Sequence, residues 1–147
     1  MRAHALRLLG AAFAVTLVVT GCATPPTQEM SDARQAIGSA RGVEASQYAP
    51  RSMQDAERLL DDAERSLKQG RYDTARDEAL EARQAAMRAR EVAVAIADAR
   101  AAVAQAKARG NDPSAAERLI GEAQAAGRDG DESRAWELAT EALRSLQ

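Results

Sequence analysis

The chain has 147 residues, of which 46% are hydrophobic, 29% charged and 3% aromatic, and its formal net charge is −2. This length fits one modest domain and leaves no room for a second large one. Because the total is acidic and aromatic residues are few, no nucleic-acid partner is expected.

The first residues have the layout of a secretion signal, and we predict a signal peptide over residues 1–21. Arg2 and Arg7 form a basic start, and residues 8–19 are an apolar run too short to span a bilayer as a stable helix. The run ends in Val-Thr-Gly-Cys at residues 19–22, which resembles the lipobox that lipoprotein-processing enzymes recognise. We therefore expect cleavage between Gly21 and Cys22.

Cys22 is the predicted lipidation site, because its thiolate is the nucleophile that accepts diacylglycerol. After cleavage its free amine would accept an N-acyl chain. Two or three acyl chains give lasting membrane attachment, where one chain would be marginal. The alternative is an ordinary signal peptide with a chance cysteine. Ala23 follows where an aspartate would resemble an inner-membrane retention signal, so the expected location is the periplasmic face of the outer membrane.

Removal of the signal also removes His4, the sole histidine, while lipid occupies the sole cysteine. Ser-His-Asp and Cys-His catalysis and a typical zinc site are then excluded. We predict no catalytic residue, no metal and no cofactor apart from the covalent lipid, and hence no enzyme.

The mature chain reads as all-α, because alanine is abundant and β-branched residues are sparse. Residues 22–30 are predicted as the lipidated N-terminus with a proline-rich tether, and residues 31–147 as the helical domain. A first helix is expected from Ser31, as its N-cap, to about residue 45. A second runs from Pro50 to a stop at Gly70.

A third helix is expected from about Tyr72 to Gly110, and if unbroken it is about 55 Å long. Residues 110–113 form a break, after which Ser114 and Glu117 suggest a capping box for a fourth helix. A turn over residues 127–131 separates it from a fifth helix that runs to the end. The predicted fold is an elongated set of helical hairpins or a bundle, with one long central helix.

An internal repeat organises these five helices. Residues 32–37, 56–60 and 70–82 recur as residues 98–103, 116–120 and 130–142. The repeat predicts two related three-helix units, at about residues 31–90 and 91–147, that share the long middle helix.

Residues 70–75 (Gly-Arg-Tyr-Asp-Thr-Ala), followed by Ala79 and Ala82, resemble the second half of a tetratricopeptide repeat. The pattern departs where Ala79 replaces a preferred aromatic residue and where Glu132 replaces the tyrosine in the second copy. The resemblance implies tetratricopeptide-like hairpins and not a true array.

Residues 33–90 resemble a bacterial envelope family known as domain of unknown function 4398. The resemblance rests on the alanine-rich first helix, on Gln-Tyr-Ala-Pro at residues 47–50, on Ala-Glu-Arg-Leu-Leu at 56–60 and on Gly-Arg-Tyr at 70–72. Members are commonly lipoproteins, and some carry an added peptidoglycan-binding domain of the outer-membrane-protein-A type. We identify no such domain in the sequence up to Gln147. The resemblance implies a location and a fold, and it implies no activity.

Several side chains invite a site interpretation. Tyr48, Tyr72 and Trp136 are candidates for partner binding, with packing wedges as the alternative. Asp129, Asp131 and Ser133 have the early spacing of a calcium loop, but the later positions do not fit, and Asp131 suits a helix N-cap. Asp61 and Asp62 are expected to pair with Arg65 and Arg58, and Glu64 with Lys68, at four-residue spacing.

The leading functional hypothesis is a non-enzymatic helical scaffold or adaptor in the cell envelope, bound to an envelope protein or to itself. The alternative is direct binding of peptidoglycan or anionic lipid by arginines along the long helix. An enzyme that uses carboxylates alone is the third hypothesis.

Overall fold

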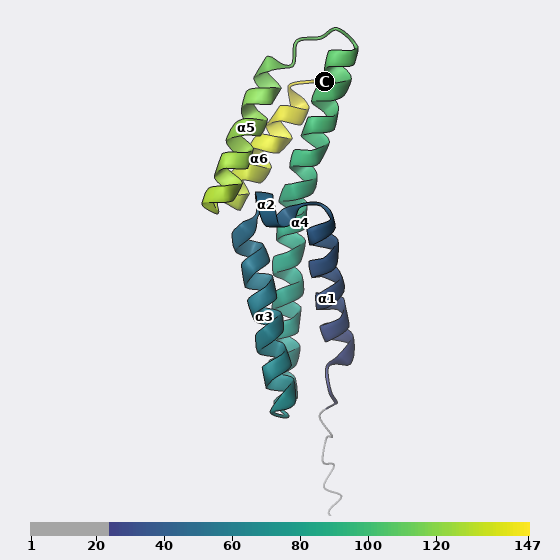
Figure 1. Cartoon of the computed structure of the whole chain (residues 1–147), viewed down its shortest axis with the longest axis vertical. Coiled ribbons are helices and arrows are strands. Elements are labelled where there is room, and N and C mark those ends of the chain that lie inside the picture. Colours follow the sequence, from purple (N-terminus) through teal and green to yellow (C-terminus); the bar gives the residue numbers. More distant parts are fainter. Residues whose placement is uncertain (1–23) are drawn as a thin grey trace, which may run out of the picture.

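The computed structural model describes residues 24–147, so the predicted signal peptide, Gly21 and Cys22 lie outside the described residues. All regular structure in the described part is helical, which confirms the all-α class (Figure 1). In chain order the helices are α1 (Thr27–Gly42), α2 (Ala45–Tyr48), α3 (Pro50–Lys68), α4 (Tyr72–Ala108), α5 (Ser114–Asp129) and α6 (Glu132–Arg144).

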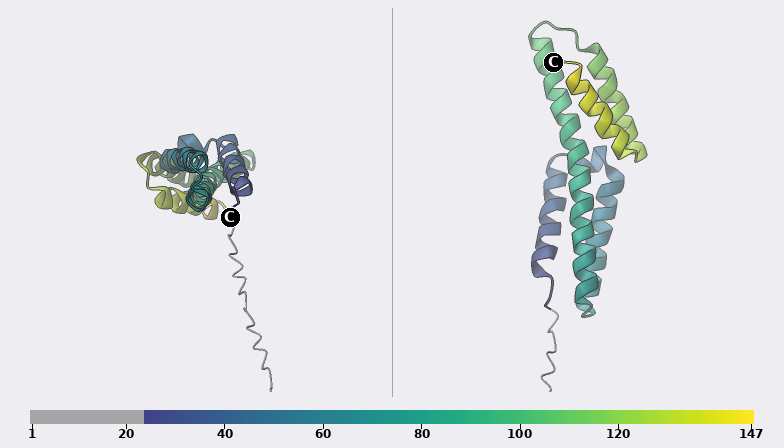
Figure 2. Two further views of the ribbon diagram at one scale, coloured as in Figure 1. Left: turned by 90° about the horizontal axis from the view of Figure 1, so that it is seen from below. Right: turned by 180° about the vertical axis from the view of Figure 1, so that it is seen from behind.

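The 37-residue helix α4 is continuous and runs along nearly the whole folded part, over about 55 Å (Figure 2). Its first half packs against α1 and α3, and its second half packs against α5 and α6 (Figure 1). The short helix α2 lies at the middle, in contact with α4, α3 and α5. The molecule is therefore two small bundles joined end to end along one shared helix.

Three helices end in the same way, at a glycine with positive φ. Gly70, Gly110 and Gly130 have φ values of 73°, 79° and 85°, a left-handed conformation that glycine adopts without cost from a Cβ atom. After each glycine the next backbone N–H donates to a carbonyl five residues earlier, as Arg71 does to Ser66 at 3.0 Å. These Schellman turns satisfy the free carbonyls at each helix end, and the predicted stop at Gly70 is confirmed.

Alanine makes up most of the core. Larger apolar side chains sit at intervals between the alanines, among them Met30, Met53 and Ile96, all at most 2% exposed. Small side chains let the backbones approach closely, but each buries little apolar area. The few large residues therefore contribute much of the burial that holds the helices together.

The start of the chain differs from the prediction. Helix α1 begins at Thr27 and not at Ser31, which is an exposed residue inside the helix. Pro26 is buried, and its carbonyl accepts the first helical bond from Met30 at 3.1 Å. Because Pro26 and Met30 both pack inward, the proline-rich segment is fixed against the bundle, and residues 27–30 of the predicted tether are helical.

Two further boundaries differ. The first helix ends at Gly42, and α2 follows as a separate element. Ser114 does not cap α5, because Pro113 occupies the cap position and the Asp112 carboxylate accepts the Ser114 N–H at 3.0 Å. Hydrogen bonds from the Ser114 hydroxyl and N–H lower the pKa of Asp112 below its ordinary value. At α6 the predicted N-cap is confirmed, since Asp131 accepts the Arg134 N–H at 3.1 Å.

Candidate interaction site at the junction of the two bundles

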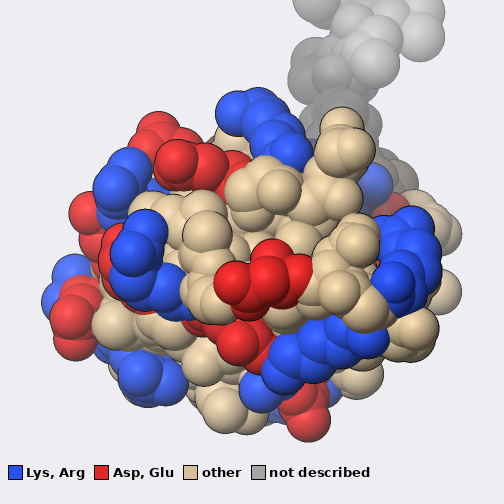
Figure 3. All heavy atoms as spheres, turned by 90° about the horizontal axis from the view of Figure 1, so that it is seen from above, with Lys and Arg blue, Asp and Glu red and all other residues tan. Residues whose placement is uncertain are grey.

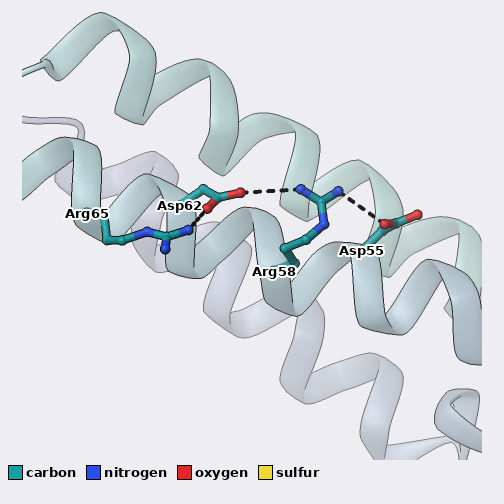
Figure 4. A network of polar contacts seen from close by, with 4 residues as sticks. All are labelled: Asp55, Arg58, Asp62 and Arg65. Atoms are coloured by element: carbon teal, nitrogen blue, oxygen red, sulfur yellow. Dashed lines mark hydrogen bonds and ion pairs between the residues drawn. The ribbon is translucent and has the colours of Figure 1, made fainter.

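The surface of α3 carries ion pairs. Asp62 pairs with Arg58 at 3.3 Å, as predicted, and also with Arg65, which was expected to pair with Asp61 (Figure 4). Glu64 pairs with Arg34 of α1 at 2.8 Å and not with Lys68. Exposed pairs of this kind contribute from nothing to about 1 kcal/mol each, so they fit a solvated helix face.

Charges of both signs are mixed elsewhere too. On the end of the molecule shown in Figure 3, basic and acidic side chains alternate with uncharged ones. Within residues 24–147 no helix is long and apolar enough to cross a membrane. Over the same residues, no group of three or more His, Cys, Asp or Glu side chains is placed to hold a metal ion.

Tyr48 lies inside the junction where the two bundles meet. It is 3% exposed, and its hydroxyl oxygen accepts a hydrogen bond from Arg100 of α4 at 2.6 Å. The Arg100 guanidinium carbon also lies 5.8 Å from the Tyr48 ring centroid, within cation–π range. At this burial Tyr48 packs between the two bundles, which favours the alternative of a packing wedge over a binding residue.

A close backbone approach lies beside Tyr48. A Cβ atom built on the buried residue Gly127 of α5 would lie 2.0 Å from the Tyr48 carbonyl oxygen and 3.5 Å from the Ala135 Cβ. Only a residue without a side chain fits between α2 and α6 at this point. Gly127 therefore sets how closely the second bundle docks on the first.

A carboxylate from the second bundle caps a helix of the first. Glu132, the first residue of α6, accepts the backbone N–H of Ser52 in α3 at 2.9 Å, and its other oxygen accepts the Ser52 hydroxyl. The first N–H groups of a helix have no partner within it. Glu132 supplies one across the junction, over a sequence separation of 80 residues.

Beside these contacts the surface is hollowed. A hollow of about 480 Å³ lies between the middle of α4 and the start of α6, and its lining residues are Arg88, Glu91, Val92, Gly130, Asp131, Glu132, Ser133, Trp136 and Glu137. Trp136 is 47% exposed and Met87, next to Arg88 in sequence, is 45% exposed. They are the exposed large hydrophobic residues of the described part.

The hollow is lined by four carboxylates and one arginine. Glu132 is bonded to Ser52, Asp131 caps α6, and Glu137 lies 3.4 Å from Arg134. Within residues 24–147 neither Glu91 nor Arg88 forms a salt bridge with another side chain. Glu91 is thus an exposed carboxylate without a counter-charge in the described part.

The three aromatic candidates therefore lie in different places. Tyr48 is buried at the junction, Tyr72 is half-buried at the start of α4, and Trp136 lines the hollow. The sequence pattern did not indicate Arg88, Glu91 or Glu132, because nothing in it brings the middle of α4 next to the start of α6. Of the residues with the calcium-like spacing, Asp131 caps α6 and Ser133 lines the rim of the hollow.

Comparison with known families gives a match for the first bundle. Residues 28–95 match the model of a family described as Domain of unknown function (DUF4398). The match supports that family for this region. The DUF4398 region spans α1 to α3 and the first part of α4, including Arg88, Glu91 and Val92, whereas α5 and α6 lie beyond it. No curated protein and no solved structure matches the chain.

Proposed function

We propose that this protein is a lipoprotein of the bacterial cell envelope that acts as a non-enzymatic helical adaptor, anchored by lipid on Cys22. The role rests on one observation: an alanine-rich bundle exposes its single tryptophan, Trp136, in a hollow at the junction. Tryptophan is enriched where proteins bind one another. Because the surface around Trp136 is otherwise polar, it favours a transient partner and not a permanent one.

The anchor fixes how the protein stands on the membrane. One residue separates Cys22 from Thr24, so the lipid would hold Thr24 within about 10 Å of the headgroups. Arg76 of α4 donates to the Thr24 carbonyl at 3.3 Å and to Glu29 of α1 at 3.0 Å, which fastens the start of the chain to the bundle. The proposed location is the periplasmic face of the outer membrane, because Ala23 follows the cysteine.

This attachment leaves the hollow well away from the membrane. Helix α1 begins at the same end as the α3–α4 turn, and the C-terminus lies at the opposite end (Figure 1). Arg88 and Val92 follow Tyr72 by 16 and 20 positions, which places them about 24–30 Å along α4 at the usual rise. The protein would be an elongated molecule attached to the membrane at one end, with its binding surface too far along α4 to contact the headgroups.

The two hairpins favour a tetratricopeptide-like scaffold. Helices α3 and α4 turn at Gly70, and α5 and α6 turn at Gly130, with the same positive-φ geometry and equivalent places in the repeat. In each hairpin small residues such as Ala79 and Ala139 are fully buried. Scaffolds built from such hairpins bind partners on exposed helix faces. The hollow beside α6 would bind a partner in the same way.

A second candidate function is binding of an anionic polymer such as peptidoglycan, or of anionic lipid. Arg83 and Arg90 favour it, because they lie seven residues apart on α4, are exposed, and form no salt bridge within residues 24–147. Sedimentation with purified peptidoglycan or with anionic vesicles tests it. Retention that disappears at moderate salt would favour this candidate.

Photo-crosslinking in living cells tests the adaptor role. A photoreactive amino acid at Ser133, on the rim of the hollow, is compared with one at Ser39, an exposed serine of α1. We expect a discrete protein adduct from Ser133 and none of that size from Ser39. No adduct at Ser133, or the same adducts at both positions, would contradict the proposal.

A further inference from the structure

We infer that the hollow beside Trp136 binds a positively charged peptide segment of the partner, with an arginine or lysine side chain placed over the indole. This inference rests on the proposed adaptor function and adds the chemistry of what is bound. It depends on the charge of the lining, on the exposed aromatic face of Trp136, and on the exposed Met87 next to Arg88 in sequence.

The lining selects by charge. Glu91, Asp131, Glu132 and Glu137 line the hollow together with Arg88, so the formal charge of the lining side chains is −3. Arg134 beside Glu137 and Arg51 against Gly130 offset part of this charge at the edge of the hollow. Charge complementarity across an interface attracts the matching partner and repels the wrong one. Among the described residues of the lining, an anionic segment would find one free cation, Arg88, and four carboxylates, whereas a cationic segment would gain the free carboxylate of Glu91 and meet three further carboxylates.

The aromatic residue suits the same ligand. Trp136 also lines a second, smaller hollow along α6, so the indole stands between two depressions and is open to solvent. Tryptophan is the side chain whose face attracts a guanidinium or ammonium group most strongly. An arginine laid across Trp136 would contact the ring and reach a carboxylate at once.

Apolar contact completes the fit. Met87, one residue before Arg88 on α4 and outside the lining, is exposed, while Val92 within the lining is 4% exposed and offers little surface of its own. Arginine and lysine pack their aliphatic stems on apolar surface and keep the charged end in polar surroundings. A segment that alternates basic and aliphatic residues therefore matches the hollow better than one that is basic throughout.

The intrinsic fluorescence of Trp136 reports on the hollow directly, because it is the one tryptophan of the chain. The full-length protein in detergent is titrated with a synthetic peptide of alternating arginine and leucine, and separately with its glutamate–leucine counterpart. We expect a saturable change in Trp136 emission with the arginine peptide and none with the glutamate peptide. Raising the salt concentration should weaken the binding.

A matched pair of charge reversals locates the binding. Glu91→Lys removes the unpaired carboxylate from the hollow, and Glu81→Lys makes the same change in net charge at an exposed position of α4 outside the lining. We expect about a tenfold loss of affinity for Glu91→Lys, from a lost attraction and an added repulsion at short range. Glu81→Lys should bind almost as the wild type does.

Three results would overturn the inference. They are no emission change with the arginine peptide, equal binding of the glutamate peptide, and equal loss of affinity in the two variants, which would indicate a general charge effect. The titration uses purified protein and does not depend on a cellular partner. A failed titration with a positive Ser133 crosslink would therefore reject the cationic ligand and leave the adaptor role standing.

Discussion

Replacing Gly127 by alanine is expected to destabilise the protein by about 2–3 kcal/mol, although alanine is the better helix former. The new Cβ atom would lie 2.0 Å from the carbonyl oxygen of Tyr48. Neither atom can turn away, because one is backbone and the other is fixed to backbone. Helix α5 must then move off α2, which opens the packing at the junction.

Gly121→Ala is the matched control for this prediction. Gly121 is an exposed residue of the same helix, and a Cβ atom there meets nothing within 4 Å. This change should stabilise the protein by up to about 1 kcal/mol through helix propensity. Urea denaturation followed by circular dichroism measures both variants. Similar unfolding free energies for the two would show that α2 and α5 do not approach each other as described.

Removal of the Glu132 carboxylate is the second change expected to weaken the junction. Glu132→Ala leaves the Ser52 N–H and hydroxyl without their partner, and Ser52 is a buried residue. An unsatisfied buried donor costs about 1–3 kcal/mol, and loss of a helix cap typically costs about 1 kcal/mol. We expect a loss of about 1–2 kcal/mol in the free energy of unfolding.

Glu137→Ala provides the comparison, because Glu137 is an exposed α6 residue whose pair with Arg134 is 3.4 Å long. It should cost less than about 0.5 kcal/mol. A double-mutant cycle with Ser52→Ala isolates the contact between the Ser52 hydroxyl and the Glu132 carboxylate, because the backbone N–H of residue 52 is still present in the variant. Additive effects of Glu132→Ala and Ser52→Ala would mean that the two side chains do not interact across the junction.

Much of the fold could be predicted because its signals are local. Pro50 suits the first turn of a helix, Gly70 supplies the left-handed conformation of a helix end, and Asp131 accepts an N–H three residues later. The uninterrupted helix of residues 72–108 follows from the lack of glycine and proline. Each of these features needs no knowledge of distant residues.

The misplaced boundaries depend on tertiary packing. Helix α1 starts at Thr27, where Pro26 is buried and Met30 packs with Ala63, Ala79 and Ala82, which are far away in sequence. Ser114 with Glu117 had the spacing of a capping box, but the Glu117 side chain reaches Lys107 of α4 at 2.5 Å. Here a contact between helices prevailed over a local pattern.

The candidate site could be predicted only in part for the same reason. Trp136 was recognisable as an unusual residue, but Tyr48 was equally so, and nothing local tells that Tyr48 is buried against Arg100 while Trp136 faces solvent. Glu91 is one of many acidic residues on a helix. Glu91 becomes part of a candidate site only because the α5–α6 hairpin folds back and brings Trp136 into the same hollow.

The junction unites the DUF4398 region with the helices beyond it. Glu132 and Gly127 lie outside the matched residues, yet they contact Ser52 and Tyr48 within them. The hollow is likewise formed by α4 residues inside the match and α6 residues outside it. The proposed binding surface therefore depends on both bundles being docked.

The central claim about where the protein acts is the lipid on Cys22, and a Cys22→Ser precursor tests it directly. Cells that express the wild-type or the variant chain are labelled with a fatty-acid analogue and separated into membrane and soluble fractions. We predict that the wild type carries the label and stays with the membranes, and that the variant carries none and loses stable attachment, because no acyl chain is added. A variant that still took up the label, or that fractionated with membranes as fully as the wild type, would contradict the account.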